Sequence, residues 1–145
     1  MLVKISILLC CLLTLQVVSR DAENGIFVAI DGMRPDKGQV ICWLHISPES
    51  FPGDDKKAIP HSKSLITSRS GDCLFFGIQP GTCAISMFDD ENSNGRLDTN
   101  FLGIPREGVT ASNNAKGHFG PPPFLDASIA YPGGHLYLRI VIPYL

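Results

Sequence analysis

The 145-residue sequence lacks an excess of basic residues, and this absence excludes a first class of function. Twelve Lys and Arg residues stand against 14 Asp and Glu residues, so the formal net charge is −2 at pH 7. A protein that binds nucleic acid carries a basic patch or stripe, whereas the densest charge cluster here is the acidic segment that starts at Asp89. The composition therefore predicts no nucleic-acid partner.

Closely spaced histidines are absent as well. The four histidines lie at positions 45, 61, 118 and 135, without the pairing through which zinc sites gather their ligands. The sequence therefore disfavours a zinc site. His45 alternates with core residues on a predicted strand, and we expect its side chain to face solvent.

The sequence also lacks an apolar run of the roughly 20 residues that a membrane-spanning helix needs. The run from Ile5 to Leu15 follows Lys4 and precedes the small or slender residues 17–19. This order is typical of a secretory signal peptide. We therefore expect residues 1–19 to be a signal peptide and residues 20–145 to form one secreted or extracytoplasmic domain, with no membrane span after cleavage.

Helical periodicity is missing from residues 20–145, and frequent Pro and Gly predict short strands joined by turns. The clearest strand is 136–142, where apolar residues occupy alternate positions. Six further strands are predicted at 26–30, 40–46, 65–68, 74–78, 82–88 and 124–130. A turn at residues 79–81, with Pro followed by Gly, is expected to make the strands before and after it the central hairpin.

Strands at this spacing predict an all-β fold. The simplest form is a single seven-stranded antiparallel β-sandwich of the immunoglobulin or transthyretin kind, with a partly closed barrel as the alternative. Residues 89–123 contain no predicted strand and form one long loop, which is uncommon unless the loop is functional or braced. The Gly, Pro and Asn residues of this loop indicate an ordered, turn-rich path.

The start of this loop has the spacing of a calcium-binding loop. Asp90, Asn92 and Asn94 place oxygen-bearing side chains at alternate positions before a glycine, and calcium takes six to eight oxygen ligands from such loops. In the same frame, we expect Arg96 to offer its backbone carbonyl and Asp98 to bind directly or through water. The pattern therefore predicts one structural Ca²⁺ ion.

The last ligand of that frame is missing. A helix-loop-helix calcium site needs a bidentate Glu at its twelfth position, where this sequence has Phe101. Two interpretations follow. The segment is either a calcium loop of another architecture, with Glu107 as a further ligand, or a polar turn in which Asp and Asn side chains cap their own backbone.

Three cysteines lie beyond residue 19: Cys42, Cys73 and Cys83. An oxidising compartment favours one disulfide and leaves one thiol over. Cys42 shares a strand face with apolar residues and is expected to point into the core, whereas Cys73 and Cys83 are out of register across the predicted hairpin. We therefore favour a Cys42–Cys73 disulfide, with three unpaired thiols as the alternative because sequence does not fix connectivity.

Several segments of the chain together resemble one family. They are residues 39–42, 51–52, 57–58, 81–85, 90–108, 112–114 and 119–122, with Phe124. They resemble the secreted bacterial domain of unknown function family 2141 (DUF2141) over nearly all of residues 20–145. The resemblance implies a secreted, compact β domain and brings no assigned activity. Asp89 stands where that family commonly has His, a change that favours oxygen-only ligation if the position belongs to a site.

The sequence contains residue types that a hydrolase needs but no catalytic motif around them. A hydrolase needs a nucleophile, a base and an orienting partner, and Ser112, His118 and Asp126 supply those residue types without a strand-turn-helix elbow around the serine. A secreted hydrolase using residues 107–126 is therefore the alternative function. We favour a non-enzymatic binding or structural module, with an extracellular protein or a glycan as its partner.

Overall fold

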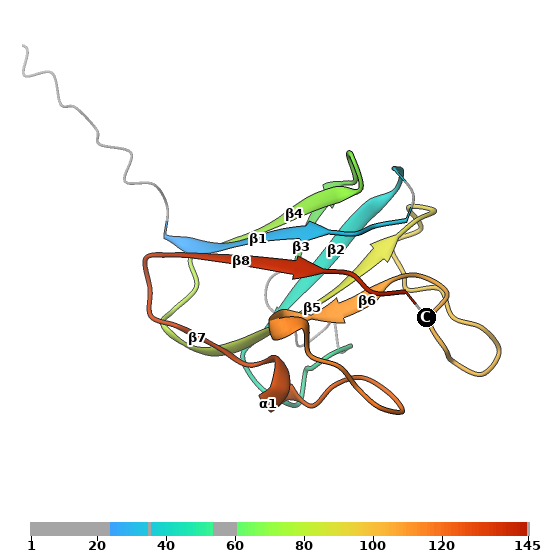
Figure 1. Ribbon diagram of the computed structural model, residues 1–145. Helices are drawn as coiled ribbons and strands as arrows, with labels where there is room; N and C mark the ends of the chain where they lie inside the picture. Colours follow the sequence, from blue (N-terminus) through green and yellow to red (C-terminus); the bar gives the residue numbers. More distant parts are fainter. Residues whose placement is uncertain (1–23, 35, 54–60, 145) are drawn as a thin grey trace, which may run out of the picture.

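The computed structural model describes residues 24–34, 36–53 and 61–144 (Figure 1). The predicted signal peptide, residues 1–19, lies outside the described residues. Within the described ranges, no helix has the length and apolar character required to cross a membrane.

Strands make up most of the regular structure, which confirms the prediction of a mostly β fold. They are β1 (Gly25–Asp31), β2 (Gln39–His45), β3 (His61–Leu65), β4 (Ser70–Phe76), β5 (Gly81–Asp90), β6 (Val109–Ala111), β7 (Ile129–Tyr131) and β8 (His135–Val141). A 3₁₀ turn, η1 (Ser112–Asn114), and one short helix, α1 (Phe124–Ala127), lie between β6 and β7. The described residues thus contain eight strands where seven were predicted.

The strands form two open sheets. The first has the order β4-β1-β8, and the second has the order β3-β2-β5-β6, with β7 also paired to β5. All of these pairs are antiparallel except β1 with β8, which is parallel. The prediction of a wholly antiparallel fold was therefore wrong. A parallel pair needs a long crossover connection, and here the first and last strands lie side by side after the chain has formed the second sheet (Figure 1).

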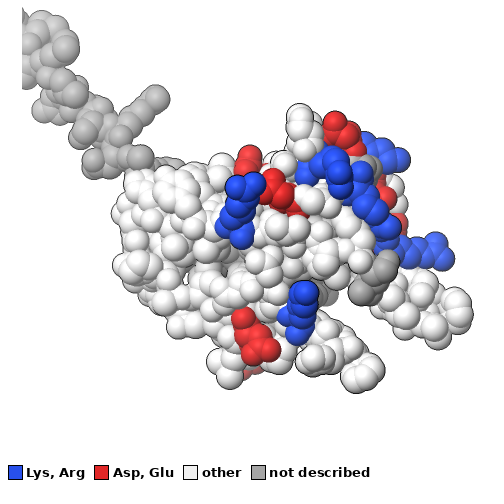
Figure 2. All heavy atoms as spheres, viewed as in Figure 1, with Lys and Arg blue, Asp and Glu red and all other residues white. Residues whose placement is uncertain are grey.

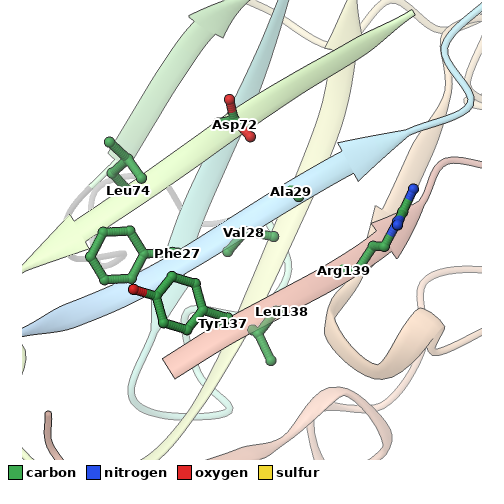
Figure 3. Close-up of a pocket in the computed structure, with 8 residues that line it drawn as sticks. All are labelled: Phe27, Val28, Ala29, Asp72, Leu74, Tyr137, Leu138 and Arg139. Atoms are coloured by element: carbon green, nitrogen blue, oxygen red, sulfur yellow. The ribbon is translucent and has the colours of Figure 1, made fainter. Parts of the chain in front are cut away.

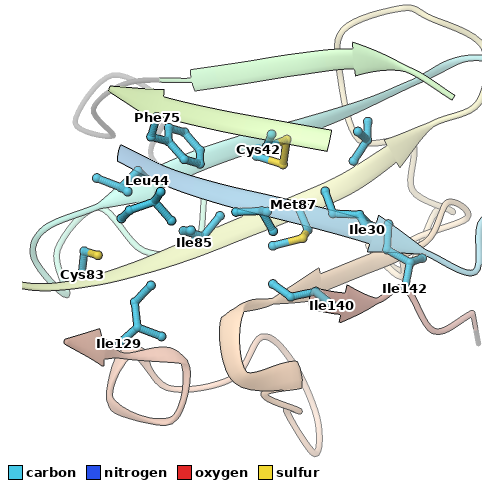
Figure 4. Packing of buried hydrophobic residues seen from close by; sticks show 14 of the residues in the cluster. Ile30, Cys42, Leu44, Phe75, Cys83, Ile85, Met87, Ile129, Ile140 and Ile142 are labelled. Carbon is cyan, nitrogen blue, oxygen red and sulfur yellow. A yellow bond between two sulfur atoms is a disulfide. The ribbon is translucent and has the colours of Figure 1, made fainter. Parts of the chain in front are cut away.

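The hydrophobic core lies between the two sheets. Alternate residues of β1 (Ile26, Val28 and Ile30) are buried, as strand geometry requires when one face of a sheet is covered. They belong to the same apolar cluster as Ile85 and Met87 of β5, in the other sheet (Figure 4). The side chains at the intervening strand positions point to the outer face of each sheet.

One disulfide crosses this core. Cys42 of β2 and Cys73 of β4 form it, with an S–S distance of 2.02 Å, which confirms the predicted pair and joins the two sheets. Cys83 is a free, buried cysteine. Burial raises the pKa of its thiol to about 11, so this group stays protonated and behaves as a small apolar side chain.

The predicted central hairpin does not form. The turn at residues 79–81 carries the chain from one sheet to the other, because β4 pairs with β1 whereas β5 pairs with β2, β6 and β7. β3 lies at His61–Leu65 instead of 65–68, because Ser68 and Arg69 have φ angles of 52° and 59° and make a turn. Local turn chemistry indicated a reversal at residues 79–81 but did not specify which strands would pair.

The segments predicted as strand 124–130 and as a strandless loop 89–123 also differ from expectation. Residues 124–127 form α1 after the Pro-rich residues 121–123, and only the last part of the segment extends as β7. Ser128 supports the helix end by donating its hydroxyl to the carbonyl of Phe124 at 2.8 Å. Within the loop, β6 adds an edge strand to β5.

Candidate functional site

The acidic loop connects two neighbouring strands of the second sheet. Asp89 and Asp90 end β5, and β6 begins at Val109. Because β5 pairs with β2 on one side and with β6 on the other, both ends of the loop are fixed by the sheet. The loop extends beyond the end of this sheet, at the right of Figure 1.

Asp90 is the buried residue at the start of the loop. Its carboxylate accepts three hydrogen bonds: from the backbone N–H groups of Asn94 (2.9 Å) and Gly95 (2.8 Å), and from the side-chain amide of Gln39 (2.7 Å). The side chain is fully buried. Gly95 has a φ of 77°, a conformation that glycine adopts without steric cost, and this lets the chain turn back over the carboxylate.

Asn92, Asn94 and Asp98 close the outer part of the loop. The Asp98 carboxylate accepts the side-chain N–H groups of Asn92 (2.6 Å) and Asn94 (3.0 Å). The two amide oxygens accept backbone N–H groups, Asn92 from Asn94 at 3.0 Å and Asn94 from Arg96 at 2.8 Å. The two Asn side chains therefore meet Asp98 through their amide nitrogens, while their amide oxygens are bonded to the backbone of the loop.

Glu107 fastens the other end of the loop. Its two carboxylate oxygens accept the backbone N–H groups of Glu91 and Asp98, each at 2.9 Å. Burial raises the pKa of the Glu107 carboxyl, and the two backbone hydrogen bonds oppose that rise. Glu107 thus lies against both halves of the acidic segment although it is distant from them in sequence.

All six predicted ligand residues belong to this network, Arg96 through its backbone N–H. Among the residues that the structure describes, no group of three or more His, Cys, Asp or Glu side chains is placed to hold a metal ion. The observed contacts match the polar-turn interpretation, in which the side chains cap the backbone of the loop. A calcium ion here would use amide and backbone oxygens together with the carboxylates, and its binding stays a prediction.

A second buried carboxyl, Asp89, adjoins the loop and was not among the predicted site residues. One of its oxygens accepts the hydroxyl of Tyr144, and the other has no hydrogen-bond partner among the described residues. Burial raises the pKa of Asp89, and burial together with the Asp89 hydrogen bond raises that of Tyr144. The Arg34 guanidinium lies 4.0 Å from the centre of the Tyr144 ring. The only sequence signal was the unusual Asp at this position.

His45 is fully buried, so the expectation that it faces solvent was wrong. It does point away from the core, but the segment around Ser50 and Phe51 covers it, and the Phe51 ring packs edge-on at 5.3 Å between centroids. His45 Nε2 lies 2.7 Å from the hydroxyl of Ser86, which donates to the carbonyl of Pro52. Nδ1 lies 3.0 Å from the hydroxyl of Ser50, and that hydroxyl donates to the carbonyl of Ser47 at 3.1 Å. Each ring nitrogen thus faces a serine hydroxyl that is also bonded to a backbone carbonyl.

This environment predicts a loss of stability in mild acid. Desolvation lowers the pKa of His45 to about 4 from an ordinary value of 6.5. Between these two pH values the unfolded chain binds the proton and the folded chain does not, so the free energy of unfolding falls as pH drops from 6.5 to 4. Urea unfolding across this range should show a smaller decrease in a His45→Gln variant. Equal pH dependence in both proteins would contradict the prediction.

The three residues of the alternative hydrolase are not joined by any hydrogen bond of the described residues. The Ser112 side chain is fully buried; its hydroxyl accepts the backbone N–H of Ile85 at 2.9 Å and donates to the carbonyl of Ala127. His118 and Asp126 are exposed. Ser112 therefore ties η1 to the end of α1 and to β5.

The outer face of the first sheet carries an open hollow of about 440 Å³ (Figure 3). Its wall includes Phe27, Leu74 and Tyr137, one residue from each strand of the sheet. Sequence reasoning did not find this feature, because it depends on the order of three strands that are distant in the chain.

A family model described as "Uncharacterized protein conserved in bacteria (DUF2141)" matches residues 28–136. The chain belongs to the DUF2141 family. The match begins in β1 and ends in β8, so the acidic loop and Glu107 lie within the DUF2141 region. A search of curated proteins and a search of solved structures each found no match. The resemblance that the sequence motifs suggested is thereby confirmed, and the family brings no activity with it.

Proposed function

We propose that this DUF2141 protein is a secreted or extracytoplasmic β-sandwich of the immunoglobulin or transthyretin kind that serves as a calcium-stabilised binding or structural module. Its partner is an extracellular protein or a glycan. The observation that carries the proposal is the convergence of Asp90, Asn92, Asn94 and Asp98 in one network above Glu107. A role without catalysis fits the buried hydroxyl of Ser112, which bonds to the backbone of Ile85 and Ala127.

The composition of the network suits a hard cation. Within the loop, the Asp98 carboxylate is compensated by neutral amide groups, and Asp90 accepts neutral donors. A bound Ca²⁺ would supply the missing positive charge and would favour the ionised form of Glu107, which burial disfavours. To turn their oxygens to the ion, the Asn side chains would give up both their amide bonds to Asp98 and the backbone N–H groups that those oxygens accept.

The extracytoplasmic location draws support from the disulfide. Disulfides persist in oxidising compartments and are rare where thiols are kept reduced, and Cys42–Cys73 lies fully buried in the core. Residues 1–19 supply the predicted export signal. The sandwich assignment draws support from the strand orders β4-β1-β8 and β3-β2-β5-β6 and from the core between the two sheets.

Calcium is expected to stabilise the folded protein. At about 100 times its dissociation constant, an ion that binds only the folded state adds about 2.7 kcal/mol to the free energy of unfolding. Thermal melting with calcium and with a chelator should show this difference. Asp90→Ala should abolish it because the variant removes the buried carboxylate at the start of the loop.

Asp126→Ala is the matched control, since Asp126 is an exposed acid of α1 outside the loop. It should keep the full calcium response. Coinciding melting curves of the unmodified protein in calcium and in chelator would refute the calcium site and leave the loop as a polar turn.

A further inference from the structure

The outer end of the acidic loop is an uncharged, apolar tip formed by residues 99–105. Three of its residues are large and apolar, and Phe101, Leu102 and Ile104 are 94%, 68% and 44% exposed. Figure 2 shows this tip as the white protrusion at the right edge of the molecule. Large apolar side chains that stay in water next to one another mark interaction surfaces more often than isolated ones do.

Hydrogen bonds centred on Asn100 hold the tip in this shape. Its side-chain oxygen accepts the backbone N–H groups of Leu102 (2.8 Å) and Ile104 (3.0 Å). Its own N–H donates to the carbonyl of Ile104 at 2.8 Å, and its carbonyl accepts the N–H of Gly103 at 3.0 Å. Gly103 has a φ of 78°, which glycine adopts without steric cost. The turn therefore presents its apolar side chains outward, apart from both buried apolar clusters.

The same bonds prepare the tip to leave water. Backbone groups that enter hydrocarbon must find their partners within the protein. Four N–H groups of the tip are bonded inside it, and Pro105 has no N–H. The tip is also convex, so it suits a partner into which it can sink and not a small ligand that it would have to enclose.

Two cations flank the tip. Arg96 precedes it and Arg106 follows it, and they are the exposed charged residues of 91–108. Neither guanidinium makes a hydrogen bond or an ion pair with another residue that the structure describes. The acids Asp98 and Glu107 accept N–H groups of the loop itself. In Figure 2, Lys and Arg side chains gather at the same end of the molecule. The exposed charge beside the tip is therefore positive, although the whole chain is acidic.

This arrangement matches the layers of an anionic membrane surface. The boundary between headgroups and acyl chains takes up exposed apolar side chains, and the phosphate layer around it attracts Arg and Lys. A pocket in a protein also accepts apolar side chains, but it supplies backbone partners of its own and requires no cation on each side of the inserted segment. The internally bonded backbone and the two flanking arginines together favour lipid.

We infer that residues 99–105 insert into the surface of an anionic phospholipid membrane, with Phe101, Leu102 and Ile104 at the headgroup–acyl boundary and Arg96 and Arg106 at the lipid phosphates. Three side chains make the contact weak and reversible. This contact goes beyond the function proposed above, because it places the domain at a lipid surface. It needs no calcium, since protein groups alone shape the tip.

Sedimentation of the purified protein with vesicles in the presence of a chelator tests the insertion. The protein should bind phosphatidylglycerol vesicles, and Phe101→Ala should weaken this binding about tenfold because it removes the most exposed apolar side chain. Tyr137→Ala is the matched control. It removes a 72% exposed aromatic side chain from β8, in the other sheet, and should leave binding unchanged.

The flanking cations are tested by Arg96→Gln and Arg106→Gln. Each variant should weaken binding to phosphatidylglycerol vesicles about fivefold. The unmodified protein should bind phosphatidylcholine vesicles more weakly, and added salt should reduce its binding to phosphatidylglycerol. Equal binding to the two lipids, or unchanged binding in both Gln variants, would overturn the assignment to an anionic surface.

Tryptophan placed at the tip reports its depth. Phe101→Trp should bind like the unmodified protein, and its emission should shift to shorter wavelength on phosphatidylglycerol vesicles, whereas Tyr137→Trp should show no shift. Absence of vesicle binding in chelator, or equal binding by Phe101→Ala, would overturn the inference. Binding that appears only with calcium would assign the contact to the ion and would also overturn it. Calcium stabilisation is measured by melting without lipid, so either proposal can fail alone.

Discussion

Replacing both Cys42 and Cys73 by alanine is expected to lower the free energy of unfolding by about 3 to 4 kcal/mol. The disulfide closes a loop with a sequence separation of 31 residues, and the loss of chain entropy that this imposes on the unfolded state accounts for a value of that size. The bond also joins β2 to β4, and hence the two sheets. Its removal should therefore weaken the whole domain and not one hairpin.

Urea unfolding of the double variant and of the unmodified protein measures this difference. Cys83→Ala is the control, because it removes one buried sulfur without removing a crosslink and should cost no more than about 1 kcal/mol. Reduction of the unmodified protein should reproduce the loss seen in the double variant. A double variant within about 1 kcal/mol of the unmodified protein would show that the crosslink contributes little beyond packing.

The sequence predicted those parts of the fold that depend on local alternation. The strands around Ile26, Val40, Ile85 and Ile140 were recognised because their apolar side chains alternate along the chain and face a common core. This alternation does not indicate the order in which the strands pair. The parallel contact of β1 with β8 joins the two ends of the described chain, and no local pattern distinguishes a parallel partner from an antiparallel one.

In the site as well, the sequence indicated contacts between residues close in the chain and missed contacts between distant residues. Asp90, Asn92, Asn94 and Asp98 lie within nine residues, so their spacing alone indicated that they belong to one polar loop. The contact of Asp89 with Tyr144 spans 55 residues. The burial of His45 likewise depends on a segment that folds over the outer face of its sheet. Tertiary cover of this kind overrides strand alternation and leaves no trace in the periodicity.

Replacing Asp90 by alanine in the absence of calcium is expected to cost about 1 to 3 kcal/mol of unfolding free energy. The variant removes the acceptor of three part-buried hydrogen bonds. The Asn94 N–H keeps the Asn92 amide oxygen as an acceptor, whereas the Gly95 N–H and the Gln39 amide lose the carboxylate that accepted them. Asp98→Ala is the comparison. The Asn92 and Asn94 amides that it releases are exposed and regain water, so its cost should stay below about 1 kcal/mol.

Amide hydrogen exchange locates the effect of Asp90→Ala within the loop. The backbone N–H of Gly95 should exchange faster in the variant because its acceptor is gone, and that of Asn94 should change less because it keeps the Asn92 amide oxygen. Those of Glu91 and Asp98 should remain protected, since they donate to Glu107. Loss of protection at all four positions would show that Asp90 organises the entire loop. Unchanged protection at Asn94 and Gly95 would show that the buried carboxylate does not cap the turn in solution, and the geometric basis for an ion at this position would then be lost.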